Sequence, residues 1–179
     1  MRIIAGAWRG RRLAAPPSLA TRPTADRVRE ALFSMLASRL GSFEGLRVAD
    51  LFAGTGALGL EALSRGAAHC VFVEQDRVAL DALKANVAAL GADASILAQP
   101  VATLGPARTP CDLLLLDPPY DSGGGGALLE RLARLGWVAP GAWVSVETGQ
   151  RENVGASGFT LATERIHGKA KLTLLRAGG

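Results

Sequence analysis

The chain has 179 residues, of which 49% are hydrophobic and 20% charged, with a formal net charge of +4. This length suits one domain with a substantial core, and the composition argues against intrinsic disorder. No apolar stretch approaches the ~20 residues of a membrane-spanning helix, and the N-terminus lacks the apolar run of a signal peptide, so we expect a soluble cytoplasmic protein without membrane partners.

The first predicted element is a basic arm. Residues 2–14 alternate apolar and basic side chains around Gly6 and Gly10, which predicts a short hairpin-like structure. Residues 1–40 hold eight arginines against two acidic residues, a balance of +6, whereas the remainder of the chain carries −2. Arginine suits phosphate contacts and base stacking, and Trp8 lies among these arginines. The arm favours a polyanionic partner, and a solvated face that only aids solubility is the alternative.

A helix is expected next, from Thr24 to the stop at Gly41. Its apolar residues recur on one face, and Arg27 and Arg29 are expected to point away from that face.

A glycine motif follows the first apolar strand, residues 46–51. Gly54, Gly56 and Gly59 have the spacing that permits a tight turn and close approach of a ligand to the backbone, and a helix over residues 57–65 starts at once. Free N–H groups at a helix start favour an anionic group. The next strand, residues 70–74, ends in Glu74, near the ~20-residue offset at which an acidic side chain reaches ribose hydroxyls. These features predict a site for an adenosine-containing ligand.

The most informative tetrapeptide is Asp117-Pro118-Pro119-Tyr120, at the end of an apolar strand that covers residues 111–117. Two successive prolines remove two backbone donors, which leaves the carbonyls and the Asp117 carboxylate as acceptors. An exocyclic amine of a nucleobase can donate to these acceptors while Tyr120 covers the ring. An ordinary strand-ending turn is the alternative, because Asp-Pro alone is common in turns.

The whole pattern after residue 46 alternates strand and helix. Further helices are expected over residues 77–90 and 127–135, and further strands over residues 94–98 and 142–147. This alternation predicts a doubly wound α/β fold, with a parallel sheet covered on both faces. Residues 159–166 and 171–176 predict a closing antiparallel hairpin.

Neither the cysteines nor the histidines have the spacing of a metal site. Cys70 and Cys111 start predicted strands and are expected as buried thiols. His69 and His167 flank strands far apart in the sequence, where surface or edge positions are expected. No metal is therefore expected.

Together the glycine loop, Glu74 and the Asp-Pro-Pro-Tyr segment resemble class I S-adenosylmethionine-dependent amino-N-methyltransferases, in which Asp-Pro-Pro-Tyr is the target-amine motif. Residues 2–13, 22–30 and 52–66 are similar to the bacterial RsmD family, which methylates a guanine N2 in 16S ribosomal RNA. The resemblance implies the seven-stranded, Rossmann-like methyltransferase fold with S-adenosylmethionine as cofactor. It also implies 16S ribosomal RNA or the assembling small ribosomal subunit as partner, and we expect a monomer.

With this resemblance, three groups of candidate site residues can be named. The catalytic group is Asp117, Pro118, Pro119 and Tyr120. The cofactor-binding group is Asp50, Phe52, Ala53, Gly54, Thr55, Gly56, Glu74, Gln75 and Gln99, where Gln99 replaces the Asp or Asn that such enzymes usually place near the adenine amine. The RNA-binding group is Arg2, Trp8, Arg9, Arg11, Arg12, Arg22 and Arg29. Residues 1–23 would form a basic RNA-binding arm, and residues 24–179 the methyltransferase domain.

Three other functions remain open at this point. A DNA adenine or cytosine amino-methyltransferase would use the same amine motif, but 179 residues leave no room for a recognition insertion. A nicotinamide-dependent enzyme would explain the glycine motif, but no second domain is left for its substrate. A non-catalytic RNA-binding module would explain the basic arm alone.

Overall fold

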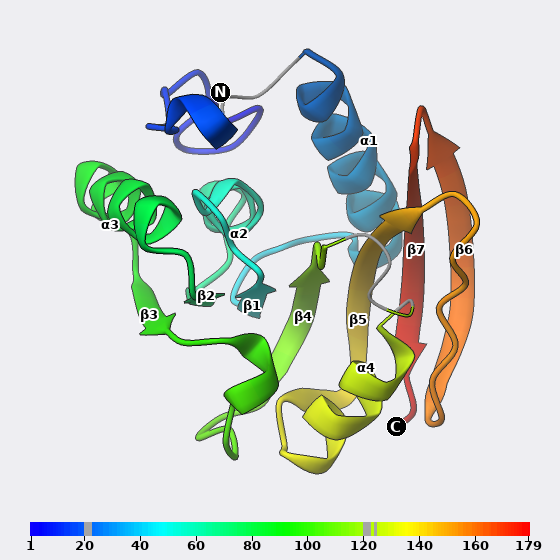
Figure 1. Ribbon diagram of the computed structural model, residues 1–179. Coiled ribbons are helices and arrows are strands. Elements are labelled where there is room, and N and C mark those ends of the chain that lie inside the picture. The colour runs from blue at the N-terminus through cyan, green and yellow to red at the C-terminus, as the bar shows by residue number, and fades with distance from the viewer. Residues whose placement is uncertain (20–22, 120–122, 124) are drawn as a thin grey trace.

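The computed structural model describes residues 1–19, 23–119, 123 and 125–179 (Figure 1). Its centre is a seven-stranded sheet in the order β3-β2-β1-β4-β5-β7-β6. β1 to β5 run parallel, and β7 is antiparallel to both of its neighbours, β5 and β6. The predicted doubly wound α/β fold with a closing hairpin is confirmed.

Seven strands and four α-helices make up this arrangement among the described residues. The strands are β1 (Arg47–Leu51), β2 (His69–Glu74), β3 (Ala94–Ala98), β4 (Cys111–Leu116), β5 (Val138–Gly149), β6 (Phe159–His167) and β7 (Ala170–Ala177). The helices are α1 (Pro23–Leu40), α2 (Ala57–Ser64), α3 (Arg77–Leu90) and α4 (Gly126–Arg134), with short 3₁₀ turns η1 (Pro17–Leu19) and η2 (Val101–Thr103). β5 is longer than the expected residues 142–147, because Val138 also pairs with Cys111 ahead of a register shift.

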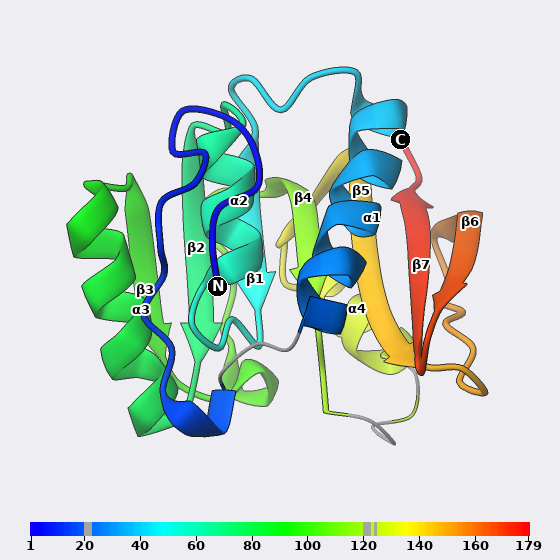
Figure 2. The same cartoon turned by 90° about the horizontal axis from the view of Figure 1, so that it is seen from above.

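Both faces of the sheet are covered, as its apolar strands require. Leu113 and Leu115 of β4 pack in the core beneath α1, α2 and α3, whereas Leu114 and Leu116 pack in the core beneath α4. Successive residues of a strand point to opposite faces, so a run of four leucines fills both cores. Figure 2 shows α1, α2 and α3 on one side of the sheet and α4 on the other.

The arm lies on the domain, over α2 and α3 (Figure 1). Arg2 and Arg12 form a single antiparallel bridge, and Ile3 and Leu13 beside them are buried in the core shared with α1, α2 and α3. The expected hairpin-like arm is therefore present, although it is a narrow loop with one bridge and no regular strands.

The sulfur and imidazole side chains follow expectation. Cys70 and Cys111 are free and buried, and His69 and His167 lie half-buried at strand ends. Among the helices described, none is long and apolar enough to cross a membrane.

Candidate active site

A cavity of about 510 Å³ opens at the carboxyl ends of the parallel strands. Its walls include Phe52 and Gly54 after β1, Glu74 at the end of β2, and Asp117 after β4. Parallel strands bring their carboxyl ends to one edge of the sheet, which is why motifs far apart in the sequence meet here. The two predicted motifs, glycine loop and amine motif, thus share one cavity.

The glycine loop has two kinds of glycine. Gly54 has φ +57° and nothing within 4 Å of a Cβ, so it leaves an open surface at the cavity. A Cβ on Gly56 would lie 2.5 Å from Leu83 Cδ1, and one on Gly59 would lie 2.4 Å from Phe72 Cε1. Gly54 therefore gives ligand access to the backbone, whereas Gly56 and Gly59 allow α2 to pack against the strand and helix beneath it.

Asp50 supports this loop from below. It is 1% exposed, and its Oδ2 accepts a hydrogen bond from Gly59 N at 2.8 Å in the first turn of α2. Burial raises the pKa of Asp50 well above its ordinary value, and the nearby carboxylates of Asp117 and Glu74 add to the rise. Asp50 is thus a buried brace with no surface in the cavity.

Glu74 joins two loops of the cavity. Its Oε2 accepts from Gly54 N at 2.7 Å, and its Oε1 accepts from Gln75 N at 2.8 Å and Asp76 N at 2.9 Å. A carboxylate has about four lone-pair sites, so acceptor capacity remains on the side that faces the cavity. Glu74 can therefore hold the loop and still accept a hydrogen bond from a hydroxyl group of a ligand.

Asp117 stands on the other side of the cavity with Glu147. The residue is solvent-accessible, yet the surrounding protein limits hydration of its carboxylate, and this raises the pKa of Asp117 to about 7, with the Glu147 charge contributing. Glu147 was not among the expected site residues. Its position near the carboxyl end of a strand beside β4 is the signal that would have found it.

The other expected cofactor residues form two groups, one that lines the cavity and one that is buried behind it. Phe52, Gly54, Glu74, Gln75 and Gln99 line the cavity together with Asp117, Pro118 and Pro119. Ala53, Thr55 and Gly56 are buried in the turn behind Gly54. Tyr120 and Arg22 lie outside the described residues. Within the described part of the chain, no three His, Cys, Asp or Glu side chains form a group that could hold a metal ion.

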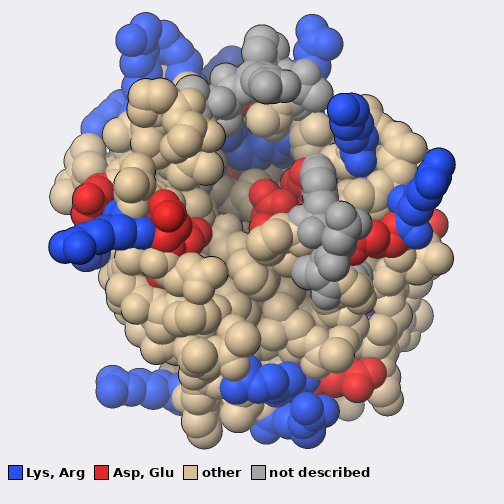
Figure 3. Space-filling model, viewed as in Figure 1, with Lys and Arg blue, Asp and Glu red and all other residues tan. Residues whose placement is uncertain are grey.

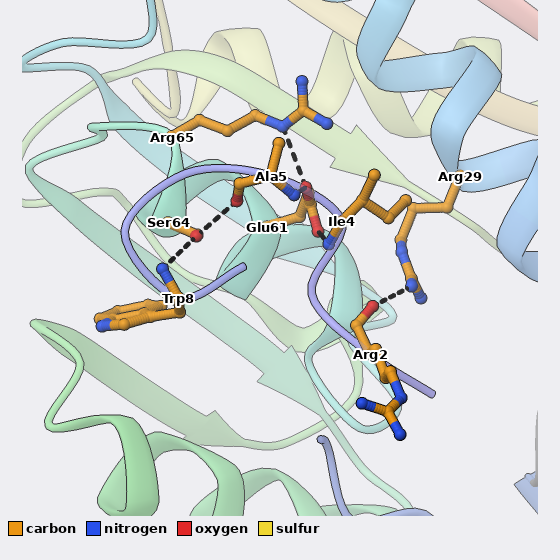
Figure 4. Close-up of polar contacts among 8 residues, drawn as sticks. All are labelled: Arg2, Ile4, Ala5, Trp8, Arg29, Glu61, Ser64 and Arg65. Atoms are coloured by element: carbon orange, nitrogen blue, oxygen red, sulfur yellow. Dashed lines mark hydrogen bonds and ion pairs between the residues drawn. The ribbon is translucent and has the colours of Figure 1, made fainter. Parts of the chain in front are cut away.

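The arm is fixed to α2 by buried polar contacts (Figure 4). Glu61 Oε2 accepts from Ile4 N at 2.9 Å and Oε1 from Ala5 N at 3.0 Å, and the same Oε1 pairs with Arg65 Nε at 3.0 Å. The Glu61 side chain is fully buried. The helix that begins at the cavity therefore also carries the arm.

Ser64 and Asn86 complete the attachment. Ser64 Oγ accepts from Trp8 N at 3.0 Å and donates to Ala5 O at 2.6 Å. Asn86 Oδ1 accepts from Ala14 N at 2.6 Å, while its Nδ2 donates to Ala14 O and to Thr55 O, both at 3.0 Å. Asn86 thus ties the end of the arm to the glycine loop. A single amide on the otherwise apolar buried face of α3 was the sequence signal for it.

The expected orientation of Arg29 is wrong. Arg29 is 5% exposed, and its Nη2 donates to Arg2 O at 2.5 Å. We expected Arg29 to point away from the buried face of the helix. Arg29 is buried instead, because the arm covers the part of α1 that carries it. Arg2, Arg9, Arg11 and Arg12 are exposed, Trp8 is half-buried, and Arg11 Nη2 also donates to Ala89 O at 3.0 Å.

Known proteins resemble this chain over nearly its full length. Residues 1–176 match the model of a protein family described as conserved hypothetical protein 95. The ribosomal RNA small subunit methyltransferase D of Escherichia coli K12 is 42% identical over 154 residues, which cover 83% of this chain and 74% of the relative. The protein of the same name from Haemophilus influenzae is 36% identical over 175 residues, which cover 94% and 89%.

A solved structure agrees with these relatives. The putative methyltransferase yhhF from Escherichia coli superposes with a TM-score of 0.87 at 36% identity, and the match covers 100% of this chain and 98% of that one.

Proposed function

This chain belongs to the RsmD family of small-subunit ribosomal RNA methyltransferases, and we infer that it transfers a methyl group from S-adenosylmethionine to the exocyclic N2 amine of a guanine in 16S ribosomal RNA. The observation that carries this inference is the shared cavity, which is lined by Asp117 and Pro118 together with Gly54 and Glu74. The loop and Glu74 form a nucleoside site, and Asp117 and Pro118 form a site for an amine.

The groups that line the cavity fit the proposed cofactor by their hydrogen-bonding capacity and their charge. Backbone N–H groups near the start of α2 suit a carboxylate, Glu74 suits ribose hydroxyls, and Gln99 is proposed to contact the adenine. Glu74, Asp117 and Glu147 bring three carboxyl groups to the cavity wall, which favours a cationic ligand. When bound, S-adenosylmethionine supplies an electrophilic methyl group on a positively charged sulfur.

The residues after β4 would position the target amine. The N2 lone pair of guanine is conjugated with the ring, so the amine is a weak nucleophile until it is held in place. We propose that the Asp117 carboxylate and the Pro118 carbonyl each accept a hydrogen bond from the amine. Asp117 then takes the proton that the amine releases as the N–C bond forms. Tyr120 is proposed to cover the base. The guanine must be unpaired or flipped out of its helix to reach this site.

The substrate surface combines an acidic cavity with basic surroundings. Figure 3 shows acidic side chains in the hollow of this face and lysines and arginines mostly towards its rim. The exposed arginines of the arm would hold phosphates that flank the target while the carboxylates receive the base. We propose 16S ribosomal RNA or the assembling small subunit as the partner of a monomeric enzyme in the cytoplasm.

The activity should depend on the ionisation of Asp117. Only the carboxylate form accepts both the amine hydrogen bond and the proton, and the pKa of this group is raised to about 7. We therefore expect kcat/KM to rise with pH, with an inflection near pH 7, when initial rates are measured across pH 5.5 to 9 at fixed ionic strength. Asp117→Asn should lose this inflection along with most activity, and a flat profile for the unmodified enzyme would contradict the assignment.

Replacement of Glu74 should weaken cofactor binding. Glu74→Ala removes the acceptor for Gly54 N and the proposed acceptor for the ribose hydroxyls, so S-adenosylhomocysteine binding should lose about 2–4 kcal/mol. Isothermal titration calorimetry measures this loss, with thermal unfolding as the control for folding. The affinity of Glu74→Gln for S-adenosylhomocysteine should lie between those of the unmodified enzyme and Glu74→Ala. An unchanged dissociation constant for Glu74→Ala would remove Glu74 from the cofactor site.

The arm should act on RNA and leave the cofactor site unaffected. Replacement of Arg9, Arg11 and Arg12 together by Ala should flatten the salt dependence of RNA binding by up to about three units in the slope of log K against log salt. Affinity for S-adenosylhomocysteine should barely change. A triple variant that keeps the original slope would show that these arginines form a solvated face.

Methyl transfer from labelled cofactor distinguishes this function from its rivals. We expect label in small-subunit ribosomal RNA, none in duplex DNA that offers adenine and cytosine, and calorimetric binding of S-adenosylhomocysteine but not of NAD. Label in DNA would favour a DNA amino-methyltransferase, and the absence of any transfer would favour a binding module.

A further inference from the structure

A second concave surface, which shares no lining residue with the catalytic cavity, lies between α1 and β6. It has a volume of about 360 Å³. We call it the α1–β6 groove and define it by its six polar residues: Ser34, Ser38 and Arg39 from α1, and Thr163, Arg165 and His167 from β6. Ala31 and Met35 complete its lining. Every polar side chain in the lining carries a hydrogen-bond donor or a positive charge, and no carboxylate is among them.

Neither arginine of the groove forms an ion pair with an acidic residue in the described part of the chain. Arg39 and Arg165 are both exposed, and the ion pairs of the described residues involve neither of them. The nearest acidic neighbour in sequence, Glu164, lies 3.9 Å from Lys171 Nζ. It comes next to Arg165 on the strand and so points to the other face of the sheet. The groove therefore holds a positive charge that the protein does not neutralise.

His167 adds an unused polar atom. Its Nε2 is buried and has no hydrogen-bond partner among the described residues. Buried polar atoms are normally hydrogen-bonded, so His167, which lines the groove, keeps an unused hydrogen-bonding capacity. Hydroxyl groups, an imidazole and two guanidinium groups together are the donor set for phosphate oxygens.

The groove is on the same side of the sheet as the arm. α1 lies between them (Figure 2), and Arg29 of α1 donates to Arg2 O of the arm. β6 runs parallel to β5, since both are antiparallel to β7, so its last residue, His167, lies at the edge of the sheet where the catalytic cavity opens. One strand of RNA that enters the cavity thus has basic surfaces on both sides of α1.

We propose that the α1–β6 groove binds the phosphate backbone of the substrate RNA and is a second anchor, separate from the arm. This proposal rests on the proposed function, because it takes ribosomal RNA as the ligand. The exposed arginines at the open groove suit a continuous backbone better than a free phosphate ion, which would favour an enclosed site.

The double variant Arg39→Ala/Arg165→Ala tests the proposal. Both side chains are exposed, so the variant should fold, and thermal unfolding checks this. With a fragment of small-subunit RNA that contains the target guanine and long flanks, we expect RNA affinity to fall and the salt slope to flatten by about one to two units. The affinity for S-adenosylhomocysteine should not change. Inorganic phosphate at millimolar concentration should compete with the RNA only as an equal increase in ionic strength does.

The matched control removes the same charge elsewhere. Arg108 and Arg134 are exposed and lie just before β4 and β5, at the opposite edge of the sheet from the cavity, so Arg108→Ala/Arg134→Ala should keep the original slope. His167→Gln should weaken RNA binding less than the double variant does. An unchanged salt slope in the groove variant, or an equal change in the control, would overturn the proposal.

Two further outcomes separate this proposal from others. If the groove variant binds naked RNA normally but methylates small-subunit particles poorly, the groove contacts a ribosomal protein and the RNA assignment is wrong. The groove variant could show the expected change in the salt slope of RNA binding while the unmodified enzyme transfers no methyl group to that RNA. In that case the groove proposal stands and the proposed function fails.

Discussion

Asp117→Ala should lower the rate of methyl transfer by about 10²- to 10⁴-fold while cofactor affinity stays within a few fold. The carboxylate is proposed to accept from the target amine and to receive its proton, and both interactions strengthen in the transition state. The cofactor is proposed to be held mainly by the glycine loop and Glu74, which line the same cavity. The rate effect therefore far exceeds the binding effect.

Single-turnover rates at saturating RNA, together with calorimetry of S-adenosylhomocysteine, measure the two quantities separately. Asp117→Asn is the conservative comparison, because it keeps the size and one acceptor oxygen but cannot take the proton at neutral pH. Its rate should lie between those of the other two proteins. Unchanged turnover in Asp117→Ala would remove this residue from the catalytic group.

Glu61→Ala should lower the free energy of unfolding by about 3–5 kcal/mol. The substitution leaves Ile4 N, Ala5 N and Arg65 Nε without their shared acceptor, in a place where the carboxylate is fully buried. Arg65 keeps its contact with the Phe33 ring, 4.9 Å from the guanidinium carbon to the ring centroid, so the backbone donors of the arm bear most of the loss.

Urea unfolding measures the stability change, and hydrogen exchange at Ile4 and Ala5 shows whether the arm has detached. Glu44→Ala serves as the matched control, because Glu44 is an exposed glutamate that precedes β1. The free energy of unfolding of Glu61→Gln should lie between those of the unmodified protein and Glu61→Ala. If Glu61→Ala unfolds at the same urea concentration and slope as the unmodified protein, the arm is held by its apolar contacts alone.

α2 links the cavity to the arm. It begins after Gly56 beside the cavity and holds the arm through Glu61 and Ser64 further along the same helix. Asn86 adds a second link, since one amide contacts both Ala14 of the arm and Thr55 of the glycine loop. The basic surface is therefore held rigidly relative to the proposed methyl donor, which is what transfer to one defined nucleotide requires.

Local sequence patterns predicted the sheet and the two ends of the cavity. The leucine run of β4, the Gly54 turn and the acidic end of β2 are each formed by a few consecutive residues. Such short motifs can be recognised directly in the sequence. The carboxyl ends of parallel strands then meet by topology, which brought Glu74 and Asp117 to one cavity as expected.

Contacts between distant segments could not be predicted from such local patterns. Helical periodicity predicted that Arg29 points away from the apolar face of α1. Nothing in the sequence of α1 indicates that the arm covers Arg29. Glu61 and Asn86 bind residues of the arm that are 56 to 72 positions away, and these partners are backbone groups that leave no trace in the sequence. The α1–β6 groove was missed for the same reason, since its two walls are formed by helix and strand residues far apart in the chain.

Nucleoside mass spectrometry of small-subunit ribosomal RNA tests the proposed reaction most directly. RNA from cells that carry this gene is compared with RNA from cells that lack it, before and after incubation with the purified enzyme and S-adenosylmethionine. We expect one N2-methylguanosine to be missing from the RNA of the deficient cells and to be restored by the enzyme, but not by Asp117→Ala. An unchanged N2-methylguanosine content, or restoration of a different modified nucleoside, would contradict the proposed function.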